Sequence, residues 1–289
     1  MEVLVVLSRL LFSAFSNVFQ KQLTHRGFDS LFIVFSAYLV LAVICLPLLF
    51  LFDPFSLTTT FWINIFFAAL LDMAGTVYLV MSLSKTDLSI FGPLNAYKVV
   101  VSMILAMIFI GEIPNLQGFF GVAVIVAGSY FLFPAKTTQQ SRIKTLLKDK
   151  GVQYRFLSIL LFSIGTLPLK TAVVNGGALA TTVFWCLLGL PLAAMTQWFF
   201  IKGKLQENMT KAQGNIQSFI YLGCLIFLMQ YMTMLVFSQL FVAYSLALFQ
   251  LSMVLQVFLG YRIFNEQYIW RRLSACLVMV AGSLLVLNA

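Results

Sequence analysis

Two opposite charges stand inside long apolar stretches of this chain. Asp72 lies in AALLDMAGTVY and Lys98 lies in PLNAYKVVVS. A charge at the centre of a bilayer costs roughly 2.5–3.5 kcal/mol on insertion scales, so two of them in neighbouring stretches require an explanation. We predict that they face each other or a water-filled cavity, as a structural ion pair or, as we favour, in a transport pathway. There a solute carboxylate would meet Lys98 and a solute amine would meet Asp72.

Polar residues at helical spacing extend both positions into faces. Asn95, Lys98 and Ser102 fall at i, i+3 and i+7, while Asp72 and Thr76 fall at i and i+4. Later in the chain, the polar residues at similar depth are uncharged, so we expect ionic groups from the first part of the chain and amides from the second. Further candidates for solute contact, by hydrogen bonding or stacking, are Asn17, Tyr97, Trp185, Gln230, Tyr244 and Gln250.

Nothing in the sequence resembles a catalytic or nucleotide-binding constellation. The only histidine is His25, there is no HExxH, GxSxG or GxxxxGK[ST] motif, and the four cysteines stand in apolar runs without CxxC spacing. We therefore predict no catalytic residue, no metal site, no cofactor and no enzymatic activity. An intramembrane enzyme and a non-transporting scaffold are the alternatives outside transport.

The composition places these residues in a membrane. Of 289 residues, 61% are hydrophobic and 9% are charged, and the mean hydropathy is +0.99. A soluble core could not hide so much apolar surface, and a membrane helix needs roughly 20 apolar residues. We predict an all-α polytopic protein of the cell (inner or plasma) membrane with lipid as a partner. Its ten transmembrane helices are expected at 3–22, 30–52, 61–83, 87–110, 115–133, 154–173, 178–199, 216–238, 241–263 and 269–288.

The chain contains an internal repeat. Glu112 and Glu266 each precede an Ala-Gly-Ser, at 127–129 and 281–283, by the same number of positions. We assign both glutamates a structural role at the positive N-terminus of the helix that follows each of them. Lys21 and Lys170 likewise end the first and sixth predicted helices at corresponding places.

The repeat divides the chain into 1–133, a basic polar linker at 134–153, and 154–289. Because each half has five spans, the second half must enter the membrane from the opposite side, which gives two inverted five-helix repeats with a solute site near the midplane.

Basic residues gather in alternate connections. The formal net charge is +9, and the Lys and Arg residues between spans fall in connections 1–2, 3–4, 5–6, 7–8 and 9–10, with Lys21 in the first and Arg155 in the linker cluster. In a membrane chain such residues set orientation and do not indicate nucleic acid as a partner. The positive-inside rule predicts that these connections are cytoplasmic and that both termini are outside.

The chain resembles the drug/metabolite transporter (DMT) superfamily, in its EamA-like ten-helix branch. The residues that carry the resemblance are Pro93, Gly111-Glu112, Gly118, Gly121, Gly128, Asn265-Glu266 and Gly282. The second half departs from the pattern, with Ala247 in place of a proline and Asn265 in place of a glycine.

The resemblance implies a transporter in which helices one, three, four, six, eight and nine line a central cavity. We expect secondary-active transport of a small polar or amphipathic metabolite, such as an amino acid or amine, by alternating access. A broad-specificity drug exporter with Asp72 as its single essential charge is the alternative. Members of the superfamily are usually drawn with both termini in the cytoplasm, which opposes the charge pattern. The coupling ion, a proton or another ion, the direction and the choice between monomer and homodimer stay open.

Overall fold

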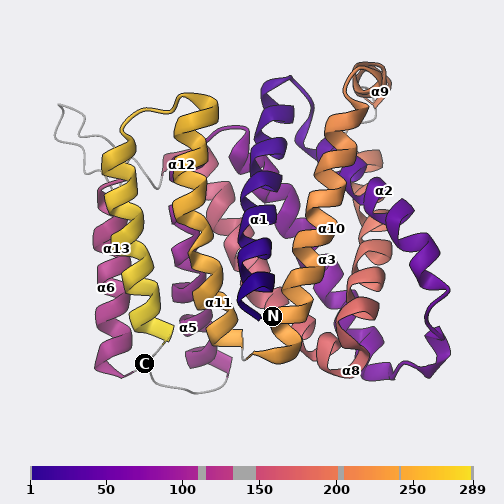
Figure 1. Cartoon of the computed structure of the whole chain (residues 1–289), viewed down its shortest axis with the longest axis horizontal. Helices are drawn as coiled ribbons and strands as arrows, with labels where there is room; N and C mark the ends of the chain where they lie inside the picture. Colours follow the sequence, from indigo (N-terminus) through magenta and orange to yellow (C-terminus); the bar gives the residue numbers. More distant parts are fainter. Residues whose placement is uncertain (1, 110–114, 133–147, 201–204, 241, 288–289) are drawn as a thin grey trace.

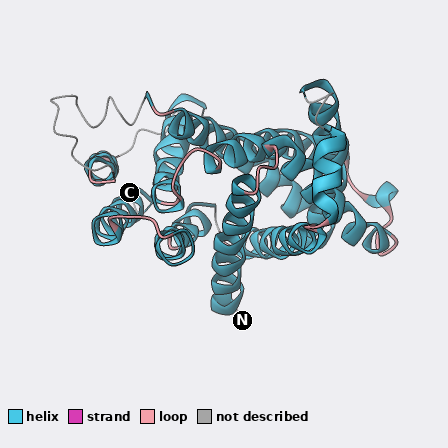
Figure 2. Cartoon of the chain, turned by 90° about the horizontal axis from the view of Figure 1, so that it is seen from above, coloured by secondary structure: helices cyan, strands magenta, loops and turns pink. Residues whose placement is uncertain are grey.

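The computed structural model describes residues 2–109, 115–132, 148–200, 205–240 and 242–287, and within these ranges the chain is helical without β-strands (Figure 2). The elements in chain order are α1 (Glu2–His25), α2 (Ser30–Leu49), η1 (Pro54–Ser56), α3 (Thr59–Leu83), α4 (Leu88–Phe91), η2 (Pro93–Ala96), α5 (Tyr97–Phe109), α6 (Leu116–Tyr130), α8 (Lys150–Phe200), α9 (Leu205–Gln213), α10 (Ile216–Gln239), α11 (Val242–Gln250), α12 (Ser252–Phe264) and α13 (Ile269–Leu287).

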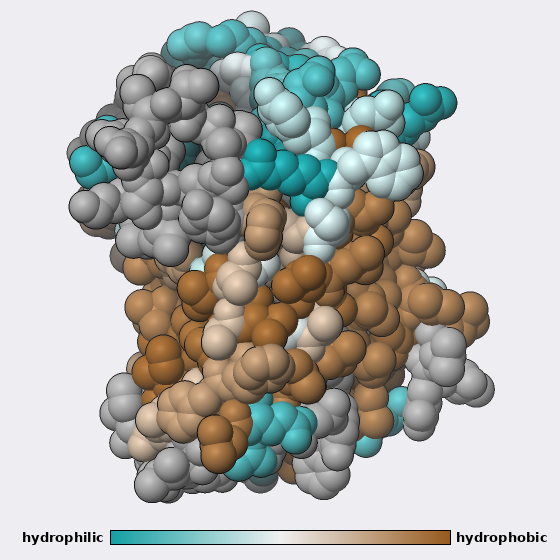
Figure 3. Space-filling model, turned by 90° about the vertical axis from the view of Figure 1, so that its left-hand side faces the viewer, coloured by the Kyte–Doolittle hydropathy of each residue, from teal (hydrophilic) through white to brown (hydrophobic). Residues whose placement is uncertain are grey.

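The protein is a multi-pass membrane protein. Six helical stretches in the described ranges are long and apolar enough to cross a bilayer, and two shorter apolar helices accompany them. On the face shown in Figure 3, a broad hydrophobic band separates the hydrophilic residues at the two ends of the molecule. The six stretches are Ser30–Leu49, Thr59–Leu83, Leu88–Leu105, Lys150–Phe199, Ile216–Gln239 and Ile269–Val286.

The longest element, α8, consists of two helices joined at a glycine. Gly177 has φ 77° and ψ 167°, a backbone conformation that L side chains rarely adopt. At 1.5 Å per residue, a straight helix of this length would be more than twice as long as a bilayer core of roughly 30 Å. The bend at Gly177 therefore separates the helix over 150–176 from the helix over 178–200, between the two spans expected at 154–173 and 178–199.

Polar side chains begin several of the helices. Asp29 accepts a hydrogen bond from the Leu31 N–H at 2.9 Å at the start of α2, and Asn115 accepts one from the Gly118 N–H at 3.0 Å at the start of α6. Each cap satisfies a backbone donor that the helix itself leaves unpaired. These short polar residues therefore fix where the apolar segments begin.

The predicted helix over 87–110 is broken. The chain leaves α4 at Gly92, continues as the 3₁₀ segment η2 from Pro93, and enters α5 at Tyr97. Pro93 has no N–H and clashes with the preceding turn, which accounts for the break. Asn95 consequently lies in η2 and not on the same continuous helix as Lys98.

The predicted helix over 241–263 is broken as well, between α11 and α12 at Leu251. No proline stands there. Instead, the Leu251 N–H binds the Leu248 carbonyl at 3.2 Å and the Val254 N–H binds the Leu251 carbonyl at 3.3 Å, both with the three-residue spacing of a 3₁₀ turn. The two halves therefore share a broken segment, although only one of them has the proline.

The helices α6 and α13 pack against each other at one edge of the bundle. In Figure 1, α6 and α13 lie side by side at the left edge, α2 and α8 lie towards the right, and α1 begins and α13 ends at the same end of the bundle. A Cβ on Gly121 would meet the Gly282 carbonyl oxygen at 2.8 Å, and a Cβ on Gly282 would meet that of Gly121 at 2.9 Å. These glycines allow α6 and α13 to approach closely, as expected for small residues between membrane helices.

Two basic residues that were counted with the connections lie in helices and are buried. Lys21 is in the last turns of α1, which continues to His25, in agreement with its predicted place at the end of the first helix, and its side chain is buried. Arg155 is inside α8, which begins at Lys150, and is also buried. Both have buried partners from distant parts of the chain, and local charge patterning contains no sign of such partners.

Candidate functional site

A cavity of about 170 Å³ lies among α1, α2, α3, η2, α5, α8, α10, α11 and α12. It contains most of the residues that the sequence singled out. The predicted residues that line it are Asn17, Asp72, Thr76, Asn95, Lys98, Trp185, Gln230 and Gln250. The cavity thus draws on residues from both halves of the chain.

Two predicted solute-contact residues, Tyr97 and Tyr244, and the two helix-end glutamates, Glu112 and Glu266, are not among the described residues that line the cavity. Tyr97 turns away: its hydroxyl pairs with the Ser129 hydroxyl at 2.8 Å and its ring packs edge-on against Phe156. Its position next to Lys98 puts it on a different face of the helix. The Tyr244 side chain and the whole of Glu112 lie outside the described residues.

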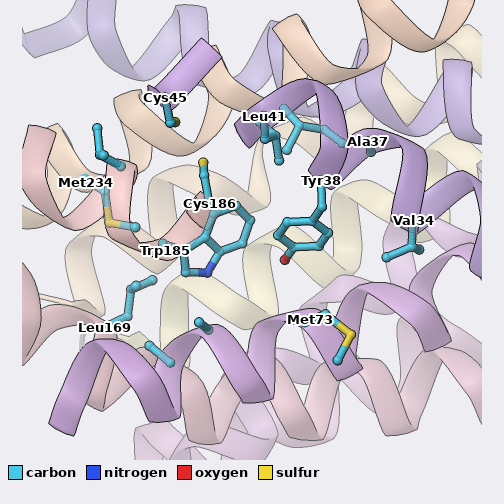
Figure 4. Packing of buried hydrophobic residues seen from close by; sticks show 14 of the residues in the cluster. Val34, Ala37, Tyr38, Leu41, Cys45, Met73, Leu169, Trp185, Cys186 and Met234 are labelled. Carbon is cyan, nitrogen blue, oxygen red and sulfur yellow. The ribbon is translucent and has the colours of Figure 1, made fainter. Parts of the chain in front are cut away.

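Asp72 is held by an indole. Its side chain is buried, and the Trp185 Nε1–H donates to Oδ2 at 3.0 Å. The Trp185 ring lies 5.4 Å from that of Tyr38, centroid to centroid, with an angle of 41° between the ring planes, and Figure 4 shows the two rings beside one another. In the described chain no ion pair within 4.0 Å joins Asp72 to Lys98, so both line the cavity without direct contact.

Lys98 has no hydrogen-bond partner among the described residues, although it is partly buried. Three charged groups act on its ammonium electrostatically: Asp72, Arg9 and Arg155. An ammonium carries three donors, and leaving them unmet in a poorly solvated place is costly. Lys98 is therefore a group that a polar solute or water would satisfy.

Arg9 is a cavity residue that the sequence analysis missed. Its guanidinium lies over the Phe249 ring, 3.7 Å from the centroid, and its Nε donates to the Thr233 hydroxyl at 3.3 Å. A signal was available, because Arg9 stands inside the first apolar stretch and shares one helical face with the cavity residues Ser13, Ser16 and Gln20.

Arg155 is the second missed residue. It is 5% exposed, its guanidinium lies 4.0 Å from the centroid of the Phe91 ring, and its Nη2 donates to Asn95 Oδ1 at 2.9 Å. Its Nε is buried without a partner among the described atoms. Arg155 directly follows the basic linker in the sequence. It was therefore interpreted as one of the basic residues that set the orientation of the chain in the membrane, and its place in the cavity was missed.

Amide side chains connect the two broken segments to their surroundings. Asn95 of η2 donates to Gln250 of α11 at 3.3 Å, and Asn17 of α1 donates to Gln256 of α12 at 3.2 Å. The buried Gln250 Nε2 has no partner in the part of the chain that the structure describes. Both breaks therefore place amide groups at the cavity wall, and the Gln250 amide among them has a donor without a partner in the described residues.

A second cluster of buried charges, outside the residues that line the cavity, surrounds Glu266. The Lys21 ammonium lies 2.9 Å from Glu266 Oε1, and Arg272 Nη1 lies 3.4 Å from Oε2. The Leu88 and Ser89 N–H groups, at the start of α4, donate to the same carboxylate at 2.6 and 2.8 Å, and the Ser89 hydroxyl donates as well. Glu266 therefore binds the N-terminus of α4. The sequence had predicted instead that it stabilises the N-terminus of the helix that follows Glu266, which is α13.

The cluster controls the protonation of Glu266. Burial alone would raise the pKa of this carboxyl, but the nearby Lys21 ammonium and the hydrogen bonds from Ser89 and Lys21 outweigh it, so its pKa lies below the ordinary value. Glu266 is consequently a carboxylate at neutral pH. Arg272 also pairs with Asp87 at 2.7 Å. Asp87 directly precedes α4, so the cluster contains a second carboxylate at the start of that helix.

The first half of the chain matches a known family. The EamA-like transporter family matches residues 1–133. Residues 1–133 are therefore similar to EamA-like transporters. The EamA-like family is part of the DMT superfamily, so the resemblance drawn from the sequence is confirmed over these residues.

Other comparisons concern the whole chain. No curated protein matches it. Among solved structures 25 chains match, and one crystal structure superposes with a TM-score of 0.64 at 10% sequence identity, covering 98% of this chain and 95% of the other. At this identity the likeness shows the fold alone.

Proposed function

We propose that the protein is a secondary-active transporter that moves a small polar or amphipathic solute by alternating access through the central cavity. The observation that carries the proposal is the concentration of charged and amide side chains in a cavity bounded by two broken helical segments. Discontinuous helices near the middle of a bilayer are a common way for transporters to present polar groups to a solute. The family of the first half supports the same function.

Ten spans in two inverted repeats are part of the proposal. The supporting observation is a pair of matching contacts at the ends of the first and sixth spans. Lys21 of α1 donates to the Thr86 carbonyl, between α3 and α4, and Lys170 of α8 donates to the Phe237 and Leu240 carbonyls, at the end of α10. Each lysine thus ends the first span of its half and bonds the chain between the third and fourth spans of the same half, as a duplication would allow.

The end of the molecule that carries the basic connections faces the cytoplasm in this proposal. Arg26, Lys85, Lys211 and Arg262 follow or end helices at that end, and the described connections at the opposite end contain no Lys or Arg. The positive-inside rule then places both termini outside a cell membrane. The coupling ion is a proton or another ion, and Asp72 is the acidic group in the cavity that could carry it.

A broad-specificity exporter is the second candidate, and the aromatic wall is the observation that favours it. Tyr38, Phe162, Trp185 and Phe249 line the cavity beside the polar groups. Such an exporter would need Asp72 as its one essential charge, whereas a selective carrier would also need Lys98.

Transport by the purified full-length protein in proteoliposomes tests the proposal. We expect time-dependent uptake of at least one class of small labelled solute, and we expect Lys98→Met to abolish it. Arg26→Met changes an exposed cation whose side-chain hydrogen bonds within the described residues go to Asn215 and Ser218, and serves as the matched control. Uptake that survives both Asp72→Asn and Lys98→Met would remove the pair from the pathway, and no uptake of any class would favour a non-transporting scaffold.

A further inference from the structure

The cavity is more positive than the sequence suggested. Four charged side chains line it, and three of them are cationic: Arg9, Lys98 and Arg155 stand against the single carboxylate of Asp72. The other residues that line it in the described chain are neutral. Buried cations without an equal number of anions are costly, which makes an anionic ligand the natural complement.

The anion and the cations differ in how far the protein satisfies them. Asp72 already accepts the Trp185 indole N–H, and the Thr76 hydroxyl is bonded elsewhere, to the Asp72 main-chain carbonyl at 2.7 Å. Lys98 has no hydrogen-bond partner among the described residues, and the Arg155 Nε is buried without one. The donors that remain to be met belong to the cations.

Both arginines are held in place by aromatic rings. Arg9 lies over Phe249 and Arg155 lies over Phe91, at 3.7 and 4.0 Å from the ring centroids. A guanidinium stacked on a ring keeps the donors along its edge available, and these donors match the two oxygens of a carboxylate or the oxygens of a phosphate. The stacking therefore orients the two arginines without using up their hydrogen-bonding capacity.

We propose that the cavity selects small organic anions, with a carboxylate or phosphate group bound by Lys98, Arg9 and Arg155. The inference rests on the proposed function and narrows its solute class. About 170 Å³ is smaller than the roughly 300–1,000 Å³ of sites for drug-sized ligands, so the anion is small. The aromatic wall, with Tyr38 and Trp185, accommodates its apolar part. Amino acids and amines, which Asp72 and Lys98 alone suggested, bind less well.

A series of four-carbon probes that differ in charge tests this selection. Succinate, butyrate, γ-aminobutyrate and butylamine are added to the purified full-length protein, and affinity is taken from the dependence of Tm on probe concentration. We expect succinate to bind at least as tightly as butyrate, γ-aminobutyrate to bind more weakly, and butylamine to produce no shift. Inorganic phosphate, added separately, distinguishes a carboxylate site from a phosphate site, and binding of either supports an anion site.

Two substitutions are expected to have different effects on the affinity for succinate. Lys98→Met removes a cation that has no described hydrogen-bond partner and should weaken succinate binding by roughly tenfold or more, the size of one lost charge-assisted hydrogen bond. Asp72→Asn removes the one negative charge among the described residues that line the cavity and should leave succinate binding unchanged or strengthen it. Arg26→Met, outside the cavity, should have no effect on binding.

Specific outcomes overturn the inference. Binding of butylamine or γ-aminobutyrate as tight as that of butyrate, failure of all the anions to bind, or a loss of succinate binding in Asp72→Asn would each do so. Measuring uptake into proteoliposomes beside binding distinguishes a failure of anion selection from a failure of the proposed transport function. Uptake of butylamine with no anion binding leaves transport standing and overturns anion selection, whereas anion binding without uptake of any probe leaves selection standing and overturns transport.

Discussion

Removal of the negative charge of Glu266 should strongly destabilise the protein. The substitution Glu266→Gln keeps the size of the side chain but leaves Lys21 and Arg272, both nearly inaccessible, without their shared carboxylate. Loss of one partner from a buried ion pair costs about 3–5 kcal/mol. The amide also cannot accept from the Leu88 and Ser89 N–H groups and both cations as the carboxylate does. We therefore expect Glu266→Gln to lower the free energy of unfolding by about 3–5 kcal/mol.

Chemical unfolding in detergent micelles, compared with wild type, measures the effect. Glu207→Gln is the matched control, because Glu207 pairs with Lys211 at 2.6 Å on the exposed surface of α9. An exposed pair at this spacing contributes about 0.3–0.5 kcal/mol. A double variant, Lys21→Met with Glu266→Gln, should lose less than the sum of the two single losses, since each change removes the need for the other partner.

The pH dependence gives a second test of the same cluster. Because the pKa of Glu266 is lowered in the folded protein, its contribution is present above the unfolded pKa, roughly 4.3, and is lost as the pH falls through the lower folded pKa. The gap in unfolding free energy between wild type and Glu266→Gln should therefore narrow in acid. A loss below about 1 kcal/mol at neutral pH, no larger than that of Glu207→Gln, would refute the reasoning.

Three further substitutions test separate contacts. Trp185→Phe removes the indole donor from buried Asp72 and should cost about 1–3 kcal/mol of unfolding free energy; no loss would mean that Asp72 has another donor. Gly121→Leu should separate α6 from α13 and lower Tm, because a Cβ there already meets the Gly282 backbone, and an unchanged Tm would contradict this packing. Gly177→Ala should also lower Tm, since φ is 77°, and a rise would contradict the bend.

Gly214→Ala is the control for both glycine substitutions. No atom lies within 4 Å of a Cβ added at Gly214, and its φ is not in the positive region. Its Tm should stay close to that of wild type, so that a loss at Gly121 or Gly177 can be assigned to close packing or to backbone conformation.

The helices were largely predictable from the sequence, because hydrophobic length alone indicates them. Each predicted span has a helical counterpart among the described residues, and the turn at Gly177 falls between two predicted spans. The break at Leu251 was not predictable, since no proline or glycine marks it. There the tertiary surroundings override the local helical preference.

The candidate site was predicted only in part, for a physical reason. Asp72 and Lys98 stood out because a charge within an apolar run has no local explanation. Arg155 had one, the neighbouring basic linker, and its real partners, Phe91 and Asn95, are far away in the sequence. Glu266 is similar: its position next to a helix start is local, but the donors that bind it belong to α1 and α4.

The bonds that build the site run between the two halves of the chain. Asn17 binds Gln256, Asp72 binds Trp185, and Arg9 binds Thr233, each joining residues more than a hundred positions apart. During synthesis the first half therefore enters the membrane with Arg9, Asp72 and Lys98 before the second half exists. Each charge at the bilayer centre costs roughly 2.5–3.5 kcal/mol on insertion scales. The helices that carry these charges therefore remain in an unfavourable state until their partners are synthesised. The order of translation thus makes completion of the second half the event that stabilises the first.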